Sequence, residues 1–355
     1  MVAGTLCVLS VLEDPAISAA VSHHVTLLDL YETTSCLTPR QASRLCQLRR
    51  LRHLSLSRIA GRPIDARVIA ALPAQLTGLM GLQSLYLYSS FNAAPSAEAP
   101  RMAVPSDLSL LRQLMRLELS GAEDCMTAVC SLPALRRLCL MQSGVTYTVP
   151  CAFDGLCQLT ALRLEWMVLG GHPAALSKLT SLRSLRVARV QLDVPAAVGD
   201  FSAAVGSMAA LTCLDLKKVG FDIPIAALSR LHRLVQLGLG KGARSFTRCN
   251  TWKRLRELDL SGNRLTGMPG NLTALLALTA LDLSGQVDMD FQVECLLTGL
   301  SHMPALRTVL LYQQSETDDE DGPRHEWSAG SMYHLSMAQR LGQQMPNLLI
   351  WESDF

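Results

Sequence analysis

The leucines of this chain recur at fixed short intervals. In LRELDLSGNRLTGMP, residues 255–269, they stand at 255, 258, 260 and 265. An amphipathic helix needs apolar residues at i, i+3, i+4 and i+7, whereas a half-buried strand needs strict alternation. The segment follows neither rule over its whole length. It predicts a short strand at Leu258-x-Leu260, followed by a tight turn through Ser261, Gly262 and Asn263.

The same spacing returns along most of the chain. With Leu258 taken as position 0, apolar residues recur at positions −6, −3, 0 and +2. Successive 0 positions lie 21 to 32 residues apart, a weaker copy lies at Leu28, and a frayed copy closes the chain in MPNLLIW. Since one unit cannot bury its leucines alone, we expect the units to stack around a continuous core. The complete copies have position 0 at Leu54, Leu85, Leu117, Leu138, Leu162, Leu185, Leu214, Leu237, Leu258, Leu281 and Val309.

A period of about 20–29 residues with the pattern L-x-x-L-x-L is typical of leucine-rich repeats, and the chain resembles that family from about residue 25 to 351. The fragments LDLSGNRLTGMP, VPAAVGDF and LSKLTSLRSLRV resemble the repeats of plants and green algae. The resemblance implies an α/β fold: a horseshoe solenoid of about twelve repeats, with a parallel inner sheet and an irregular or short-helical convex side.

The repeat also organises the rest of the chain. The opening MVAGTLCVLSVL lacks a basic region and favours a terminal strand over a secretory signal. The uncharged stretch 68–97 is long enough for a membrane span, but its prolines and the repeat register of its leucines argue against one. We expect an N-terminal cap or degenerate first repeat at 1–24, the solenoid at 25–314, an acidic loop at 315–330, and a C-terminal degenerate repeat or cap at 331–355.

The asparagine of the turn is not repeated regularly. Asn263 stands at position +5, where a buried side chain can satisfy backbone groups of the turn. Other repeats have serine there (Ser90, Ser143) or the residues Ala122, Met167, Val190 and Gly242. The sequence therefore predicts irregular turns in those repeats.

Charge and cysteine content limit the function classes. The chain has 32 basic and 30 acidic residues, a net charge of +2, so no bulk polyelectrolyte partner is implied. Its 11 cysteines show neither zinc-site spacing nor the flanking cysteine caps of extracellular family members, which favours a reducing, cytoplasmic location. No metal, cofactor or small-molecule substrate is expected.

The concave face of the expected sheet is the candidate binding surface, because such proteins bind partners there. Residues at +1, +3 and +4 should alternate out of the sheet, flanked by those at −1, and the middle strands place a tryptophan among arginines and lysines, a composition typical of interface hot spots. A solvent-facing sheet must also be polar to remain soluble, so the pattern has a purely structural explanation as well. The predicted protein-binding residues are Tyr86, Tyr88, Arg116, Arg163, Glu165, Trp166, Arg186, Arg189, Asp215, Lys217, Lys218 and Lys241.

Other activities find weaker support. The basic residues alternate with carboxylates, which makes nucleic acid an unlikely partner. The run SETDDEDGPRHEW at 315–327 fails the EF-hand register and favours a solvated loop, although Ser315 and Thr317 fit an acidophilic kinase. The chain contains no H-E-x-x-H, G-x-S-x-G or Walker A motif, so we expect no enzyme and no catalytic residues.

We therefore expect a monomeric, intracellular scaffold or adaptor that binds a protein on its concave face. The algal resemblance implies association with the cytoskeleton or the ciliary axoneme, and a role in signal transduction is compatible with it. Two alternatives remain: the substrate-recognition subunit of a ubiquitin ligase, and a fragment of a receptor or signalling protein.

Overall fold

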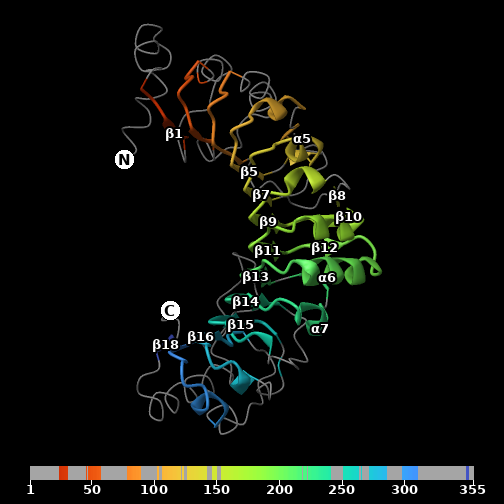
Figure 1. The fold of residues 1–355 in the computed structure, drawn as a ribbon, viewed down its shortest axis with the longest axis vertical. Helices are drawn as coiled ribbons and strands as arrows, with labels where there is room; N and C mark the ends of the chain where they lie inside the picture. The colour runs from red at the N-terminus through yellow and green to blue at the C-terminus, as the bar shows by residue number, and fades with distance from the viewer. Residues whose placement is uncertain are drawn as a thin grey trace, which may run out of the picture. The chain divides into compact units, whose positions relative to one another are not determined.

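The structure is a computed structural model of the 355-residue chain. It describes residues 24–30, 45, 47–56, 78–88, 102–103, 106–120, 122–123, 126–141, 146–149, 153–217, 219–221, 223–240, 251–263, 265, 272–285, 298–310 and 349–351. The chain divides into two compact units, Met1–Leu182 and Arg183–Phe355. Each unit is a stack of parallel strands with short helices on the side away from the strands (Figure 1).

The sheet of the first unit runs in the order β1-β2-β3-β5-β7-β9 among the described residues. The 0-position leucines lie opposite one another in every neighbouring pair, from Leu28 opposite Leu54 to Leu138 opposite Leu162. The repeat register is therefore confirmed, including its weak first copy. The strands are β1 (Leu27–Leu30), β2 (His53–Leu56), β3 (Ser84–Tyr88), β5 (Arg116–Ser120), β7 (Arg137–Met141) and β9 (Ala161–Glu165).

The second unit follows the same rule, in the order β11-β13-β14-β15-β16-β17-β18. Its 0 positions align from Leu185 opposite Leu214 to Leu281 opposite Val309. The frayed copy MPNLLIW also forms a strand, but its register is one residue away from the predicted one. Alignment with MPALRTV places Trp351 opposite Val309, whereas Ile350 lies there in the structure. The strands are β11 (Ser184–Ala188), β13 (Cys213–Leu216), β14 (Gln236–Leu239), β15 (Glu257–Asp259), β16 (Ala280–Asp282), β17 (Thr308–Leu310) and β18 (Leu349–Trp351).

The hydrogen bonds before each strand explain the spacing of the leucines. The N–H of the −3 residue donates to the carbonyl of the −6 residue, as from Leu51 to Leu48 (2.8 Å) and from Leu278 to Leu275 (3.0 Å). This single 3₁₀-like turn places the −6 and −3 side chains on the same side of the backbone. The chain then becomes extended, and alternation sends positions 0 and +2 into the same core.

The apolar positions form a fully buried core in each unit. Leu117 in the first unit and Leu214 in the second have 0% exposure. Trp252 occupies a −6 position and is also buried, and its indole N–H donates to the carbonyl of Leu228 at 3.3 Å. The polar end of this aromatic side chain is thereby satisfied inside the core.

The segments that return from one strand to the next carry short helices and a few short strands. The fold class is as expected, but β8 pairs with β10 and β4 with β6 in small parallel sheets that the repeat pattern did not predict. The helical segments are η1 (Ser106–Leu110), α5 (Met126–Cys130), η2 (Phe153–Leu156), η3 (Pro173–Lys178), α6 (Ala197–Ser207), α7 (Ile225–Leu228) and η5 (Leu272–Ala274). The short strands are β4 (Met102–Ala103), β6 (Ala122–Glu123), β8 (Thr146–Val149), β10 (Val168–Gly171) and β12 (Gln191–Leu192).

The turns after the strands share one backbone conformation at position +4. Gly262 and Gly285 have φ of 67° and 65°, and Trp166 and Arg189 have φ of 58° and 53° at the equivalent positions. The +5 residue is Asn263 after Gly262, but Met167 and Val190 after the other two. In the repeats of Met167 and Val190, the expectation of an irregular turn is therefore wrong for the φ angle of the +4 residue. The buried Met167 and Val190 side chains take the place of the asparagine, and this φ angle stays the same.

Asn263 itself behaves as its position predicts. Its side chain is 3% exposed, and its Nδ2 donates to the carbonyls of Leu239 (2.6 Å) and Leu260 (2.9 Å). It therefore ties its own turn to the preceding repeat.

Several predicted segments lie outside the described residues: nearly all of the N-terminal cap, the acidic loop at 315–330, and the C-terminal cap apart from β18. Within the described part of the chain, no helix has the length and apolar character needed to cross a bilayer.

Candidate functional site

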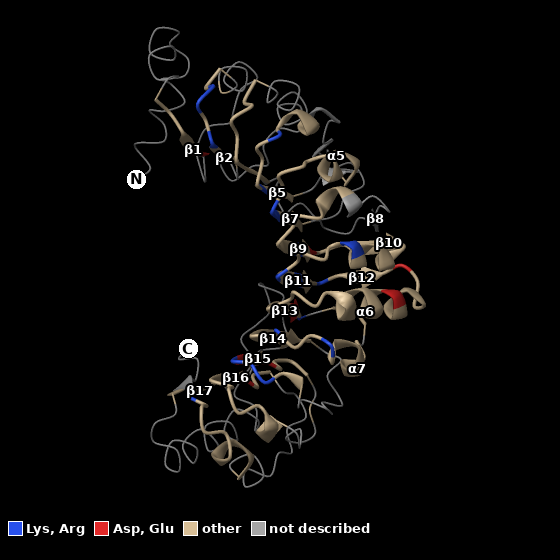
Figure 2. Ribbon diagram, viewed as in Figure 1, with Lys and Arg blue, Asp and Glu red and all other residues tan. Residues whose placement is uncertain are grey.

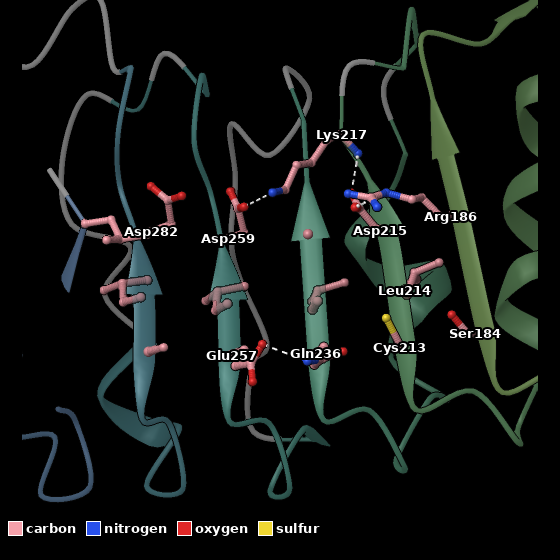
Figure 3. Close-up of a pocket in the computed structure, with 16 residues that line it drawn as sticks. Ser184, Arg186, Cys213, Leu214, Asp215, Lys217, Gln236, Glu257, Asp259 and Asp282 are labelled. Carbon is pink, nitrogen blue, oxygen red and sulfur yellow. Dashed lines mark hydrogen bonds and ion pairs between the residues drawn. The ribbon is translucent and has the colours of Figure 1, made fainter. Parts of the chain in front are cut away.

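The sheet of the second unit carries a groove (Figure 3). Its cavity volume is about 380 Å³. It runs across strands β11 to β17, on the face opposite the leucine core, which we call the open face. Its lining comprises Ser184, Arg186, Cys213, Leu214, Asp215, Lys217, Gln236, Leu237, Gly238, Glu257, Leu258, Asp259, Ala280, Leu281, Asp282 and Leu310.

The repeat register arranges these side chains in rows. Since neighbouring strands align 0 to 0, their −1 residues form one row on the open face, and their +1 residues form the next. The −1 row reads Ser184, Cys213, Gln236, Glu257, Ala280 and Thr308, and the +1 row reads Arg186, Asp215, Gly238, Asp259, Asp282 and Leu310. The groove is therefore a regular grid in which each strand contributes one side chain to each row.

Two ion pairs connect different strands across the grid. Arg186 on β11 donates through Nε to Asp215 Oδ2 on β13 at 2.9 Å. Lys217, just after β13, crosses over β14 and pairs its ammonium with the carboxylate of Asp259 on β15 (Figure 3). These pairs hold the long basic side chains along the sheet.

Gly238 makes the longer crossing possible. It is the +1 residue of β14, between Asp215 and Asp259. A Cβ atom added there would lie 2.9 Å from Asp215 Oδ1 and 3.1 Å from Lys217 Cε. The missing side chain therefore provides the space through which Lys217 reaches the second strand away.

The three aspartates of the +1 row also bind backbone at the strand ends. Asp215 Oδ1 accepts from the N–H of Lys217 at 3.1 Å, Asp259 Oδ1 from that of Ser261 at 2.9 Å, and Asp282 Oδ1 from that of Ser284 at 2.9 Å. The same short sequence, Asp-Leu followed by Lys or Ser, produces this contact three times. Each carboxylate is fixed by its own strand end. The remaining oxygen of Asp215 pairs with Arg186, and that of Asp259 pairs with Lys217.

The lining carries more negative than positive charge. Both signs occur on the strands of this face (Figure 2), and the lining contains Arg186 and Lys217 against the four carboxylates of Asp215, Glu257, Asp259 and Asp282. Burial by itself would lower the pKa of Lys217, but the hydrogen bond and attraction of Asp259, with Asp215 and Asp282, outweigh it and raise the pKa. Lys217 is therefore a firmly charged member of the grid.

Asp282 is in a different position from the other two aspartates. Burial raises the pKa of its carboxyl group and the nearby charge of Asp259 adds to this, while hydrogen bonds from Ser284 and the charge of Lys217 oppose it. No basic side chain of the described residues forms an ion pair with Asp282. Its charge is thus the least compensated in the +1 row.

The −1 row is mostly uncharged. Gln236 Nε2 donates to Glu257 Oε2 at 2.7 Å. Burial raises the pKa of the Cys213 thiol, with Asp215 and Glu257 adding and a hydrogen bond with Ser184 opposing. The thiol is thereby kept protonated and poorly nucleophilic at neutral pH.

Comparison with known proteins identifies the fold. An internalin of Listeria monocytogenes, InlF, superimposes with a TM-score of 0.56 at 16% sequence identity, over 98% of this chain and 92% of the internalin chain. A TDR receptor structure superimposes with a TM-score of 0.53 at 19% identity, over 84% of this chain and 50% of the receptor chain. The fold is a leucine-rich repeat solenoid. No family model matches the sequence, and no curated protein does either.

The leucine-rich repeats of the first unit carry six of the predicted binding residues. Tyr86 is half-buried on β3, Arg116 is exposed at the start of β5, and only the backbone of Tyr88 is described. Arg163 and Glu165 form an ion pair at 2.6 Å within β9, and their hydrogen bond raises the pKa of Arg163 against the effect of burial. Trp166 follows β9 and is 43% exposed.

The second unit brings three of the predicted residues together in the groove: Arg186, Asp215 and Lys217. Arg189 lies after β11 and does not line it, and Lys218 and Lys241 fall outside the described residues. All twelve residues remain predicted binding residues.

The prediction omitted part of the groove. Ser184, Cys213 and Gln236 were missed because the −1 position was treated as a flank of the binding row. Glu257, Asp259 and Asp282 were left out in favour of the basic middle strands. Aligning the leucine-rich repeats on position 0 gives the signal, because the +1 column then reads Asp, Gly, Asp, Asp from β13 to β16.

The described part of the leucine-rich repeat solenoid contains no centre for metal binding or cysteine chemistry. The described residues contain no group of three or more His, Cys, Asp or Glu side chains that could hold a metal ion. Among their cysteines, Cys130 and Cys139 are buried, Cys213 is half-buried, and Cys157 is exposed.

Proposed function

We propose that the chain is a non-enzymatic scaffold that binds a protein partner on the open face of the second unit. One observation carries the proposal: a groove of about 380 Å³ whose charged walls are held in place by ion pairs between strands. Side chains fixed before binding lose little conformational entropy on association. Leucine-rich repeat folds typically act in this way.

The charges of the groove favour a polypeptide over a nucleic acid. Four carboxylates face two basic side chains in the lining. A phosphate backbone would meet net repulsion there, and affinity for nucleic acid depends mainly on basic contacts to phosphate. A polypeptide can complement both signs of charge along its length.

Site-directed photo-crosslinking tests the proposal. A photoreactive residue at Gln236 would lie in the groove, whereas the same residue at Gln191 on β12 serves as a matched control, since both glutamines are exposed and Gln191 is not part of the lining. We expect discrete protein adducts from Gln236, reduced by excess unmodified chain, and none of these from Gln191. Identical adducts from both positions would show that the groove is not the contact surface.

Location is a finer proposal. We place the scaffold in the cytoplasm, with the cytoskeleton or the ciliary axoneme as its site of assembly, on the strength of the algal character of repeats such as LDLSGNRLTGMP. Proximity labelling with the full chain in its native cell tests this. Enrichment of axonemal or other cytoskeletal proteins would support it, and enrichment of secreted or lumenal proteins would contradict it.

A further inference from the structure

Four neighbouring open-face positions on β15 and β16 carry an unusual set of residues. We call these four positions the grid square. Glu257 lies opposite Ala280, and Asp259 lies opposite Asp282. Neighbouring strands are about 4.8 Å apart, and residues two apart on one strand are separated by about 6.6 Å. Three corners of this small rectangle are therefore carboxylates, and the fourth is the methyl group of Ala280.

This arrangement works against the stability of the sheet. Like charges directly opposite each other on neighbouring strands are destabilising, and Asp259 and Asp282 are such a pair. Lys217 compensates Asp259 from two strands away, but the lining has no cation that pairs with Asp282 or Glu257. Proteins often retain locally destabilising residues where function requires them. We therefore interpret this pair of carboxylates on the open face as part of a binding site.

The space over Ala280 has room for a side chain that the described residues do not provide. Ala280 lines the groove, as does Leu310 on the next strand. A long side chain entering from solvent could rest its aliphatic stem against Leu310 and bring its charged end to the three carboxylates. Arginine and lysine have that combination of an apolar stem and a cationic end.

We propose that the groove selects an extended polypeptide segment that presents an arginine or lysine side chain over Ala280, held by Glu257, Asp259 and Asp282. This inference rests on the proposed function and names the chemistry of the partner. The arginine or lysine would reduce the excess negative charge of the lining from two (four carboxylates against two cations) to one.

A pooled peptide library tests the selectivity. The probe is a set of ten-residue peptides with random flanks and a fixed central residue, either arginine, its neutral isostere citrulline, or glutamate, captured on the immobilised full chain. We expect arginine to be enriched over citrulline on the order of tenfold, and glutamate to be depleted. Equal retention of arginine and citrulline peptides, or preference for glutamate, would overturn the inference.

Three variants connect the selectivity to the grid square. Asp282→Asn keeps an oxygen that can accept from the Ser284 N–H but removes the charge, and should abolish most of the arginine preference. Ala280→Lys supplies a cation from the chain itself. This variant should also abolish the arginine preference, and its thermal midpoint should be unchanged or higher. Glu118→Gln removes a +1 carboxylate from β5 in the first unit and should leave the preference intact; loss in this control, or retention in the other two variants, would contradict the assignment.

The preference should also depend on pH. Among the described residues, the groups that act on Asp282 are Asp259, Lys217 and Ser284, and burial together with Asp259 raises the pKa of Asp282. Arginine capture should therefore begin to weaken, as pH falls, at a higher pH than an ordinary aspartate would give. The Asp282→Asn variant should lack this component, and an identical pH profile in that variant would count against the proposal.

The two proposals can fail separately. Adducts from Gln236 without arginine selectivity would leave the scaffold function standing and remove the cationic segment. Failure to obtain groove-specific adducts, together with no arginine enrichment, would remove both.

Discussion

The two units have the same strand register, yet their open faces connect charges in different ways. In the first unit Arg163 pairs with Glu165 two residues farther along the same strand. In the second unit Arg186 reaches the next strand, and Lys217 reaches the second strand away. The Arg163–Glu165 pair organises one strand, whereas the Arg186–Asp215 and Lys217–Asp259 pairs connect different strands of the second unit.

One glycine distinguishes the two +1 rows. The interior +1 positions of the first unit hold Ser55, Tyr86, Glu118 and Cys139, which all have side chains. The second unit has Gly238 at an interior +1 position, so one place in its row has no side chain. Small −1 residues occur in both units, with Ala161 on β9 and Ala280 on β16. Removal of a side chain from a regular grid creates both a path for a neighbour and a place for a ligand.

The largest expected effect tests what the units share. Leu117→Ala and Leu214→Ala should each cost about 2–5 kcal/mol of unfolding free energy, because each removes a fully buried 0-position side chain and leaves a cavity. Chemical denaturation of the two variants measures this. A loss below about 1 kcal/mol in one unit alone would mean that the units do not have equivalent cores.

The core could be predicted from sequence because its rule is local. The −3 to −6 hydrogen bond and the alternation after it depend only on spacing, so the repeat frame predicted the 0-to-0 alignments within each unit from Leu28 to Val309. It failed at the frayed last copy, where Ile350 and not Trp351 lies opposite Val309. The groove could be predicted only in part. Lys217 can pair with Asp259 because Gly238, on the strand between them, has no side chain. Hydrophobic periodicity does not predict where such a glycine stands in the +1 row.

The turns show a second limit. The sequence predicts a regular turn where the buried asparagine is present, but Met167 and Val190 occupy its position in turns of the same left-handed conformation. The asparagine is therefore not required for the positive φ angle, and a +4 residue such as Trp166 adopts a backbone conformation that is unfavourable for a non-glycine residue.

A smaller effect should appear at that turn position, in both units. At Trp166 in the first unit, Trp166→Gly and Trp166→Ala both delete the indole, so their difference isolates the backbone. We expect glycine to be more stable than alanine by about 1 kcal/mol, and Gly262→Ala in the second unit to cost about the same. Thermal unfolding gives both values, and the usual order of alanine above glycine at either site would show that the left-handed turn is not imposed there.

The smallest effect is the most specific to the second unit. Gly238→Ala should change the free energy of unfolding little, because alanine loses less entropy than glycine in a strand. Its Cβ, however, would displace Lys217 from its path to Asp259. A double-mutant cycle with Lys217→Met and Asp259→Asn measures the coupling between the two side chains. For a partly exposed pair we expect a coupling of about 0.2–1 kcal/mol, falling toward zero in the Gly238→Ala background. The Arg163–Glu165 coupling serves as the control, since it lies within one strand and should be unchanged. If the Lys217–Asp259 coupling survives the added methyl group, the glycine is not what allows charges to cross strands in this unit.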